Sequence, residues 1–459
     1  MNTLRRRFSG ILSGQGLGAK AMRGSALTIL GFGGGQFLRL VSNLVLTRLL
    51  FPEAFGMMAL VYVFMQGLNN FSDVGVTPSI MQSKRGDDPE FLNTAWTIQV
   101  IRGMLLWGVT FVIAYPAAQF FDAPMLAQLL PVVGVTLAIA GFNPTRLDTA
   151  NRHLNFGRLT VIDLASQVVS LIVAIVAAWI LQSVWALVIS GIVGALVQLI
   201  FLSVFLPGQR NRFRWEPAAA NELINFGKWI FLSTVVGFFL SQGDKIILGK
   251  YLSLETLGIY NIGFFLASFP LLMGGTVTRR ILIPIYRELP PKDSPENFRK
   301  LRKMRFALSG ALMGIMFALA LVASWLINTL YDPRYTLAGG ILVMIACAQV
   351  PHLIALTYDQ AALAAGDSRR FFVLALSRTI LMLAGLVIGV KVFGLLGALI
   401  GQGFAMVLVY PVVVWLARHQ GTWDPRHDAA FAILGAGLMS IALYVNWPAV
   451  QALVALNSP

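Results

Sequence analysis

The run VWALVISGIVGALVQLIFLSVFL, residues 184–206, holds no charged side chain. A helix needs about 20 apolar residues to cross a hydrocarbon core of about 30 Å. The run therefore predicts a transmembrane helix, and the rest of the chain can be compared with it. Thirteen such spans are predicted, at residues 25–49, 56–80, 92–114, 124–142, 159–181, 184–206, 229–249, 257–278, 306–330, 338–358, 371–393, 395–417 and 429–446.

The amino-acid composition is that of a membrane protein. Hydrophobic residues make up 57% of the 459 and charged residues only 12%, against roughly 25% in soluble domains. The net charge of +15 does not indicate nucleic-acid binding, because no polar stretch is long enough to fold as a separate domain. Cys347 is the single cysteine and the four histidines are scattered, so we predict no disulfide, no metal site and no cofactor.

Orientation follows from the basic residues, since cytoplasmic loops retain Lys and Arg during insertion. If the N-terminus is cytoplasmic, twenty-seven of the 35 cations fall in inner segments, four fall outside and four lie within predicted helices. The longest inner loop, 279–305, carries nine of them. We therefore expect a cytoplasmic N-terminus and, after an odd number of spans, a periplasmic C-terminus.

An internal duplication is visible in two places. Residues 46–57, LTRLLFPEAFGM, match residues 248–259, LGKYLSLETLGI, at an offset of 202. Residues 186–191, ALVISG, match residues 398–403, ALIGQG, at an offset of 212, with Arg158 and Arg370 in step upstream. These matches pair helices 1 and 7 and helices 6 and 12, each pair crossing in the same direction, which is typical of a parallel repeat with a site between the halves.

The predicted fold class is thus all-α: a polytopic membrane protein of two six-helix lobes in parallel repeat plus about one accessory C-terminal helix, expected to be peripheral. The predicted parts are a cytoplasmic N-terminal segment 1–24, an N-lobe 25–206, a cytoplasmic linker 207–228, a C-lobe 229–417, and an accessory helix with its tail 418–459.

One stretch carries a specific resemblance. Residues 47–96 contain RLLFPEAFG, then FSDVG, then LNTAW, and they resemble the opening of bacterial oligosaccharide flippases of the polysaccharide transporter family, in the multidrug, oligosaccharidyl-lipid and polysaccharide exporter superfamily. The resemblance implies two lobes around a central cavity and a polyprenyl-diphosphate-linked oligosaccharide turned from the inner to the outer leaflet. It also implies a bacterial inner-membrane location.

Polar residues inside apolar helices are the site candidates, because charge in a bilayer is costly and tends to face a polar path. We expect a cationic cleft that binds the diphosphate, since Arg matches phosphate oxygens bidentately. Its predicted residues are Arg39, Asn43, Arg102, Lys245 and Arg378. The alternative is structural, with Arg39 paired to Asp73 or Lys245 paired to Asp244.

Asp73 and Asp244 are the candidates for binding a coupling ion, with H⁺ and Na⁺ both open, because burial raises the pKa of a carboxyl toward the range of proton exchange. Asp73 extends a polar stripe with Gln66, Asn69 and Asn70 in the second predicted span. Asp163 and Asp359, near inner helix ends, are expected to be solvated. The run GFGGG, residues 31–35, lacks the context of a phosphate loop and predicts close helix packing or a bend.

The function predicted from these features is a secondary transporter, not an enzyme, that acts by alternating access as a monomer among membrane lipids. A glycosyltransferase or polymerase would need a sizeable outer loop with acid or base residues, and the outer connections are short. Export of another amphipathic cargo by the same fold stays open.

Overall fold

The computed structural model describes residues 17–73, 75–227 and 231–455. Within these ranges the regular structure is helical, which confirms the all-α prediction. The helices are α2 (Leu17–Leu49), α3 (Pro52–Phe71), α4 (Val76–Gln82), α5 (Pro89–Phe120), α6 (Leu126–Gly141), α7 (Arg146–Arg152), α8 (Phe156–Leu181), α9 (Trp185–Phe205), α10 (Pro217–Gly227), α11 (Phe231–Tyr251), α12 (Leu254–Glu288), α13 (Pro295–Leu321), α14 (Ala323–Leu330), η1 (Pro333–Tyr335), α15 (Leu337–Ala364), α16 (Ser368–Leu408), α17 (Tyr410–His419), α18 (Pro425–Val445) and α19 (Trp447–Ala455).

Eight helical segments in the described ranges are long and apolar enough to span a membrane, or nine if the bent pair α6 and α7 forms one span. One of the eight, Ser368–His419, contains two predicted spans, which separate at non-helical backbone angles at Phe393 and Gly394. The three remaining predicted spans correspond to α2, α3 and α11.

The chain divides into two compact units. Unit 1 comprises Met1–Leu50 and Phe64–Val235, and unit 2 comprises Phe51–Val63 and Val236–Pro459. The beginning of α3 therefore belongs with unit 2 and its end with unit 1. Of the predicted N-terminal segment, residues 1–16 lie outside the described part, whereas residues 17–24 already form the start of α2.

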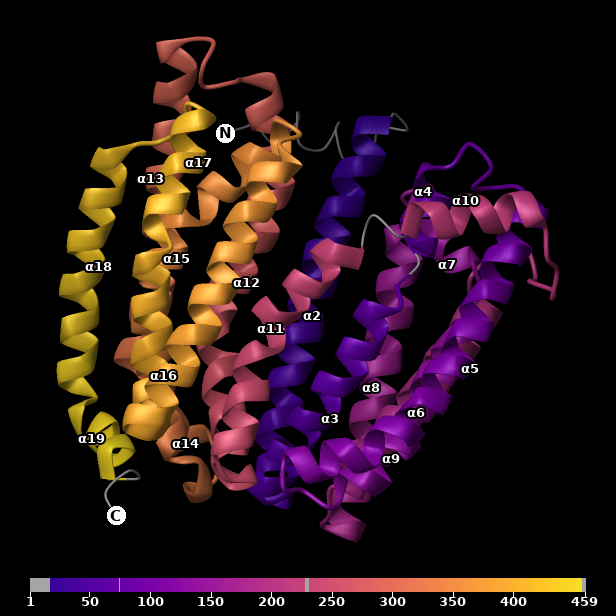
Figure 1. Ribbon diagram of the computed structural model, residues 1–459, viewed down its shortest axis with the longest axis horizontal. Coiled ribbons are helices and arrows are strands. Elements are labelled where there is room, and N and C mark those ends of the chain that lie inside the picture. The colour runs from indigo at the N-terminus through magenta and orange to yellow at the C-terminus, as the bar shows by residue number, and fades with distance from the viewer. Residues whose placement is uncertain (1–16, 74, 228–230, 456–459) are drawn as a thin grey trace, which may run out of the picture. The chain divides into compact units, whose positions relative to one another are not determined.

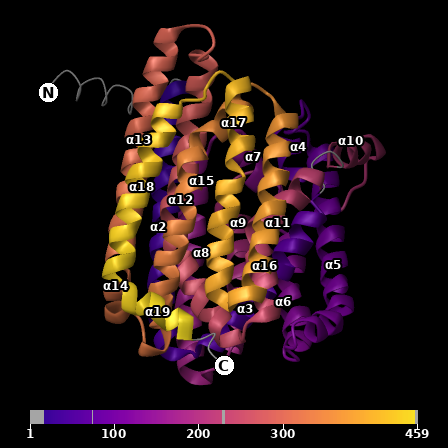
Figure 2. The ribbon, with the colours of Figure 1, turned by 60° about the vertical axis from the view of Figure 1, so that its left-hand side comes forward.

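In unit 1, α5 packs along α6, and α8 packs against both α9 and α2 (Figure 1). In unit 2, α15 is the central helix and contacts α12, α13, α16 and α18 (Figure 2). Phe431 and Met439 of α18 are buried in one apolar cluster with Met313 and Met316 of α13. One face of the accessory helix therefore packs on the core of unit 2, whereas only 28% of its apolar window is buried, as suits a peripheral helix.

The first repeat match has a structural counterpart inside unit 2. Gly56 of α3 and Gly258 of α12, equivalent at the offset of 202, lie where the two helices cross. A Cβ on Gly56 would lie 1.9 Å from the Leu254 carbonyl oxygen, and one on Gly258 would lie 2.0 Å from that of Pro52. Because Pro52 and Leu254 are also equivalent, each copy makes the same contact with the other, which is the mark of two-fold packing.

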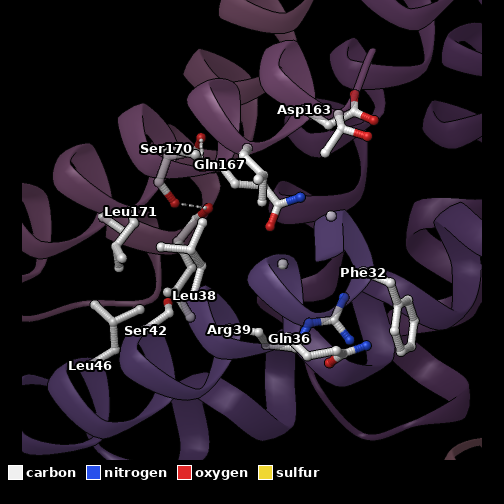
Figure 3. Close-up of a pocket in the computed structure, with 17 residues that line it drawn as sticks. Phe32, Gln36, Leu38, Arg39, Ser42, Leu46, Asp163, Gln167, Ser170 and Leu171 are labelled. Atoms are coloured by element: carbon white, nitrogen blue, oxygen red, sulfur yellow. Dashed lines mark hydrogen bonds between the residues drawn. The ribbon is translucent and has the colours of Figure 1, made fainter. Parts of the chain in front are cut away.

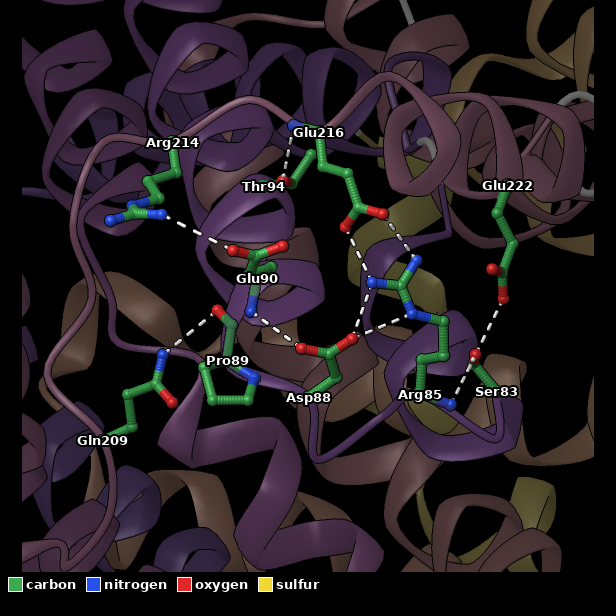
Figure 4. Close-up of polar contacts among 10 residues, drawn as sticks. All are labelled: Ser83, Arg85, Asp88, Pro89, Glu90, Thr94, Gln209, Arg214, Glu216 and Glu222. Carbon is green, nitrogen blue, oxygen red and sulfur yellow. Dashed lines mark hydrogen bonds and ion pairs between the residues drawn. The ribbon is translucent and has the colours of Figure 1, made fainter.

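The segment from α9 to α10, which the sequence places in the inter-lobe linker, is bound to unit 1 along its length (Figure 4). Alternate backbone N–H groups donate to side chains of α5: Arg212 to Asn93 at 2.9 Å, Arg214 to Thr97 at 3.1 Å and Glu216 to Thr94 at 3.0 Å. The LNTAW stretch, residues 92–96, thus supplies two of the three acceptors that hold the linker.

An ion cluster fastens the same segment. Arg85 donates to Glu216 at 2.7 Å and to Asp88 at 2.6 Å. The hydrogen bond from Arg85 holds the pKa of the Asp88 carboxyl below its usual range. Beyond the cluster, Leu223 of α10 is buried against residues of α4 and α5. The linker is therefore a docked part of unit 1.

Candidate functional site

A cavity of about 760 Å³ opens in unit 1 between α2, α8 and α9. Its polar lining comes from two helical stripes, each with one residue per turn, because residues three or four apart share a helix face. On α2 the stripe consists of Gln36, Arg39 and Ser42; on α8 it consists of Thr160, Asp163, Gln167 and Ser170. Figure 3 shows Gln36 and Arg39 across the cavity from Asp163 and Gln167.

The GFGGG run sets the spacing between α2 and α8. A Cβ on Gly31 would lie 2.5 Å from the methyl group of Thr160, and one on Gly35 would lie 3.3 Å from the Gln167 side chain. Larger residues at these positions would push the helices apart, so the prediction of close packing is confirmed.

Arg39 is the predicted site residue that lies in this cavity, and its side chain is exposed to it. Asn43, one turn further along α2, lies outside the lining, and its carbonyl accepts a hydrogen bond from Thr47 at 2.8 Å. Asp163, expected to be solvated, lies on the cavity wall and accepts from Gln198 at 3.4 Å. Arg39 and Asp163 thus give the cavity one group of each charge.

Arg102 binds the end of α3. Its guanidinium donates to the Ser72 hydroxyl at 2.9 Å and to the Asn69 carbonyl at 2.7 Å. Carbonyls at a helix C-terminus have no partner within the helix, so Arg102 caps α3.

Asp73 lies in a different setting from the predicted one. The span predicted over 56–80 is broken between α3 and α4, where Gly75 has a left-handed φ of 66° and its N–H donates to Asp73 at 2.8 Å. The stripe prediction was wrong for Asp73, because a local turn bond replaces the helical one there. Gln66 and Asn70 do face each other on α3, at 2.9 Å.

Lys245 and Asp244, neighbours on α11 in unit 2, have separate partners. The Lys245 ammonium donates to Gln242 at 3.1 Å and lies within 5.8 Å of the rings of Tyr62 and Phe264. The carboxylate of Asp244, 2% exposed, accepts from Tyr260 at 2.7 Å. Its other oxygen, Oδ1, is buried without a hydrogen-bond partner among the described residues.

Arg378 on α16 forms a two-pronged ion pair with Asp359 on α15, at 3.0 and 3.3 Å. Both side chains are buried. Asp359 was expected to be solvated; the structure corrects this, because Arg378 neutralises it inside unit 2.

Two features escaped the sequence analysis. The first is the polar stripe of α8 that contains Asp163. Its helical spacing in an otherwise apolar helix is visible in the sequence and could have indicated a cavity wall. The second is a buried network in unit 2, where His427 contacts Asp428 at 2.9 Å and Ser309 at 2.9 Å, and Asp428 accepts from Tyr358 at 2.7 Å. It joins α18 to α13 and α15, and nothing in the spacing of those residues indicated it.

Solved structures define the class of fold. The chain superposes on an inward closed conformation of the lipid II flippase MurJ with a TM-score of 0.67 and 13% identity, covering 95% of this chain and 98% of that one. It superposes on an inward-facing multidrug MATE transporter of the MOP superfamily with a TM-score of 0.62 and 13% identity, covering 86% and 95%. These superpositions show that the chain has the same fold as those two proteins.

The family follows from the sequence. The profile of the family described as "Polysaccharide biosynthesis protein" matches residues 45–339, so the chain belongs to that family, and the resemblance seen in residues 47–96 is confirmed.

Curated relatives agree with this family. The chain is 24% identical to the teichuronic acid biosynthesis protein TuaB of Bacillus subtilis over 60% of this chain and 56% of that protein. It is 23% identical to the succinoglycan biosynthesis transport protein ExoT of Rhizobium meliloti over 68% and 63%. The match to the lipopolysaccharide biosynthesis protein WzxC of Escherichia coli is 21% identical over 84% and 77%. The chain thus spans less than two thirds of the first two.

Proposed function

We propose that this protein is a secondary transporter that flips a polyprenyl-diphosphate-linked oligosaccharide from the inner to the outer leaflet of a bacterial inner membrane, for exopolysaccharide or lipopolysaccharide assembly. The family supports the polysaccharide context, and relatives named for transport and lipopolysaccharide synthesis support the class of cargo. The observation that carries the proposal is Arg39, an exposed residue in a cavity of unit 1 whose walls carry polar stripes from two helices.

Arg39 suits a diphosphate for two reasons. Its guanidinium stays charged when desolvated, and its planar fork can donate two hydrogen bonds to one phosphate group. Gln36 beside it and Gln167 across the cavity offer amide donors to hydroxyl-rich sugar. Asp163 on the opposite wall, formed by α8, would repel an anion placed against it, so the diphosphate is assigned to the α2 side of the cavity.

The other predicted cations are given different roles. Lys245, held by Gln242 and two aromatic rings, is the second substrate-binding candidate. Arg102 and Arg378 are already bound to a helix end and to Asp359, so we propose that they position helices. Asn43 is retained as a neighbour of Arg39 with a secondary part in binding.

Ion coupling is assigned to unit 2. Of the two predicted acids, Asp244 is the stronger candidate, because it is buried beside Tyr260 and has one oxygen without a partner among the described residues. Asp73 is engaged in a turn. We propose that Asp244 exchanges H⁺ or Na⁺ as the two units alternate in access, with the N-terminus cytoplasmic and the C-terminus periplasmic.

The test uses a strain that lacks this protein. We expect the lipid-linked oligosaccharide to accumulate in the inner leaflet, and wild-type protein to clear it. Arg39→Gln should lower clearance at least tenfold at equal protein level, whereas Arg39→Lys should retain part of it because the charge remains. Arg210→Gln, which removes an exposed arginine outside the cavity, is the matched control and should clear normally.

Other outcomes would replace the proposal. Unpolymerised units accumulating outside would indicate a polymerase, and a normal lipid-linked pool together with loss of another amphipathic compound would indicate a different cargo. Clearance by Arg39→Gln at the wild-type rate would remove Arg39 from the site.

A further inference from the structure

Two adjoining hollows lie where α8 begins in unit 1, away from the Arg39 cavity. One, of about 790 Å³, is polar and is lined by the start of α8, by the end of α7 and by residues 206–209. The other, of about 560 Å³, is an apolar groove between α8 and α9 lined by Val161, Ile162, Ala165, Phe201 and Phe205. Gly157 and Arg158 line both, so the two hollows are continuous.

The groove lies on an apolar, little-buried surface of two helices that are long enough to span a membrane. Only 17% of the apolar window of α8, and the same share of α9, is buried within the protein. Val161 is 67% exposed and Phe205 is 61% exposed. A groove of this kind on a membrane-spanning surface accepts hydrocarbon chains.

The ionisable residues that line the polar hollow are Asp87, His153 and Arg158. Its acid, Asp87, is already bound by His153 at 2.8 Å and by Arg152 at 3.2 Å. Arg158 is exposed and takes part in none of the ion pairs formed among the described residues. The N-cap Asn155 makes no side-chain bond to the first N–H groups of α8, which also face the hollow and favour an anion.

The second half of the repeat shows what occupies the equivalent place there. At the offset of 212, Asn155 corresponds to Asp367 and Arg158 to Arg370. The two turns match in detail: Leu154 and Gly366 have positive φ angles of 59° and 70°, and the N–H groups of Asn155 and Asp367 each donate at 2.9 Å to the equivalent residues Ala150 and Ala362.

In unit 2, however, the protein itself supplies the anion, which is the side chain of Asp367. The Asp367 carboxylate accepts from the Arg370 backbone N–H at 3.2 Å and binds the Arg370 guanidinium at 2.7 Å. Unit 1 has the same helix start and the same arginine, with a neutral Asn in place of the carboxylate and an apolar groove alongside.

We propose that the start of α8 is a binding site for an anionic phospholipid of the surrounding bilayer. Its phosphate binds Arg158 and the first N–H groups of α8, in the place that Asp367 fills in unit 2. Its acyl chains lie in the groove between α8 and α9. The site is independent of the transport cavity and does not require the proposed cargo.

The test is retention of lipid by purified full-length protein, measured by native mass spectrometry after addition of phosphatidylglycerol or of phosphatidylcholine with the same chains. Wild type should retain phosphatidylglycerol about tenfold more than phosphatidylcholine, the size of effect expected from charge-assisted hydrogen bonds. Arg158→Gln should lose this preference. Arg210→Gln, which removes an exposed cation that lines neither hollow, should keep it.

The variant Asn155→Asp distinguishes a loss of lipid binding from a loss of folding. The new carboxylate should pair with Arg158 as Asp367 pairs with Arg370, abolish the preference for phosphatidylglycerol, and raise the melting temperature of lipid-free protein. Retention of the wild-type preference by Asn155→Asp and Arg158→Gln would overturn the proposal. So would a site that rejects phosphatidylglycerol and retains only a polyprenyl diphosphate.

Discussion

At the scale of single residues, the four cations predicted within helices differ in their surroundings. Arg39 faces a cavity, Lys245 lies between aromatic rings, and Arg102 and Arg378 are bound by groups of neighbouring helices. Desolvating a charge is costly unless a partner compensates for it, so a charge bound to a partner serves structure first. Arg102 and Arg378, each bound to a neighbouring helix, are therefore assigned structural roles.

Arg378→Ala should destabilise the protein by about 3–5 kcal/mol, because it leaves Asp359 buried without its counter-charge. The double variant Arg378→Met with Asp359→Leu should recover most of the loss, since an apolar pair of similar volume is often neutral. Thermal unfolding in detergent measures both. A single variant that is stable yet inactive in export would instead place Arg378 in the substrate site.

At the scale of helices and segments, the crossing of α3 and α12 depends on two equivalent glycines. Gly258→Ala would place a methyl group 2.0 Å from the Pro52 carbonyl oxygen, so the helices must separate, at a cost of about 1–3 kcal/mol or more. Gly275→Ala on the same helix, with open space around its Cβ, should be neutral or slightly stabilising. Equal melting temperatures for the two variants would mean that the crossing is loose.

The linker gives a prediction about pH. Arg85 depresses the pKa of Asp88, so the carboxylate favours the folded form above the ordinary Asp pKa of about 3.9. This contribution is lost as pH falls through the lower, folded pKa. Hydrogen exchange of the amides of Arg212, Arg214 and Glu216, corrected for intrinsic rates, should accelerate at acid pH.

The variant Arg85→Ala should produce the same acceleration at neutral pH, because Glu216 loses its partner. Lys292→Ala, in unit 2, serves as the control and should leave these amides protected. If the linker exchanged freely in wild type at neutral pH, it would be a flexible tether and not a docked segment.

At the scale of the molecule, the sequence predicted what depends on local pattern. Apolar length predicted the helices, the GFGGG spacing predicted the close packing of α2, and residues 47–96 indicated the family. The pairing of Arg378 with Asp359, the packing of one face of α18 on α13 and the docking of the linker depend on which helices become neighbours. Periodicity does not contain that information, and for the same reason the role of Asp163 was missed.

Arg39 in the unit 1 cavity is proposed to bind the diphosphate of the lipid-linked glycan that is flipped. The most direct measurement is of flipping itself, in proteoliposomes loaded with the lipid-linked oligosaccharide. Flipping is monitored as the accessibility of the glycan to a membrane-impermeant reagent that modifies it. Wild type should expose the glycan in a time-dependent way, and Arg39→Gln should slow exposure at least tenfold, whereas Arg210→Gln, outside the cavity, should not. Equal rates for wild type and protein-free liposomes, or for wild type and Arg39→Gln, would contradict the account.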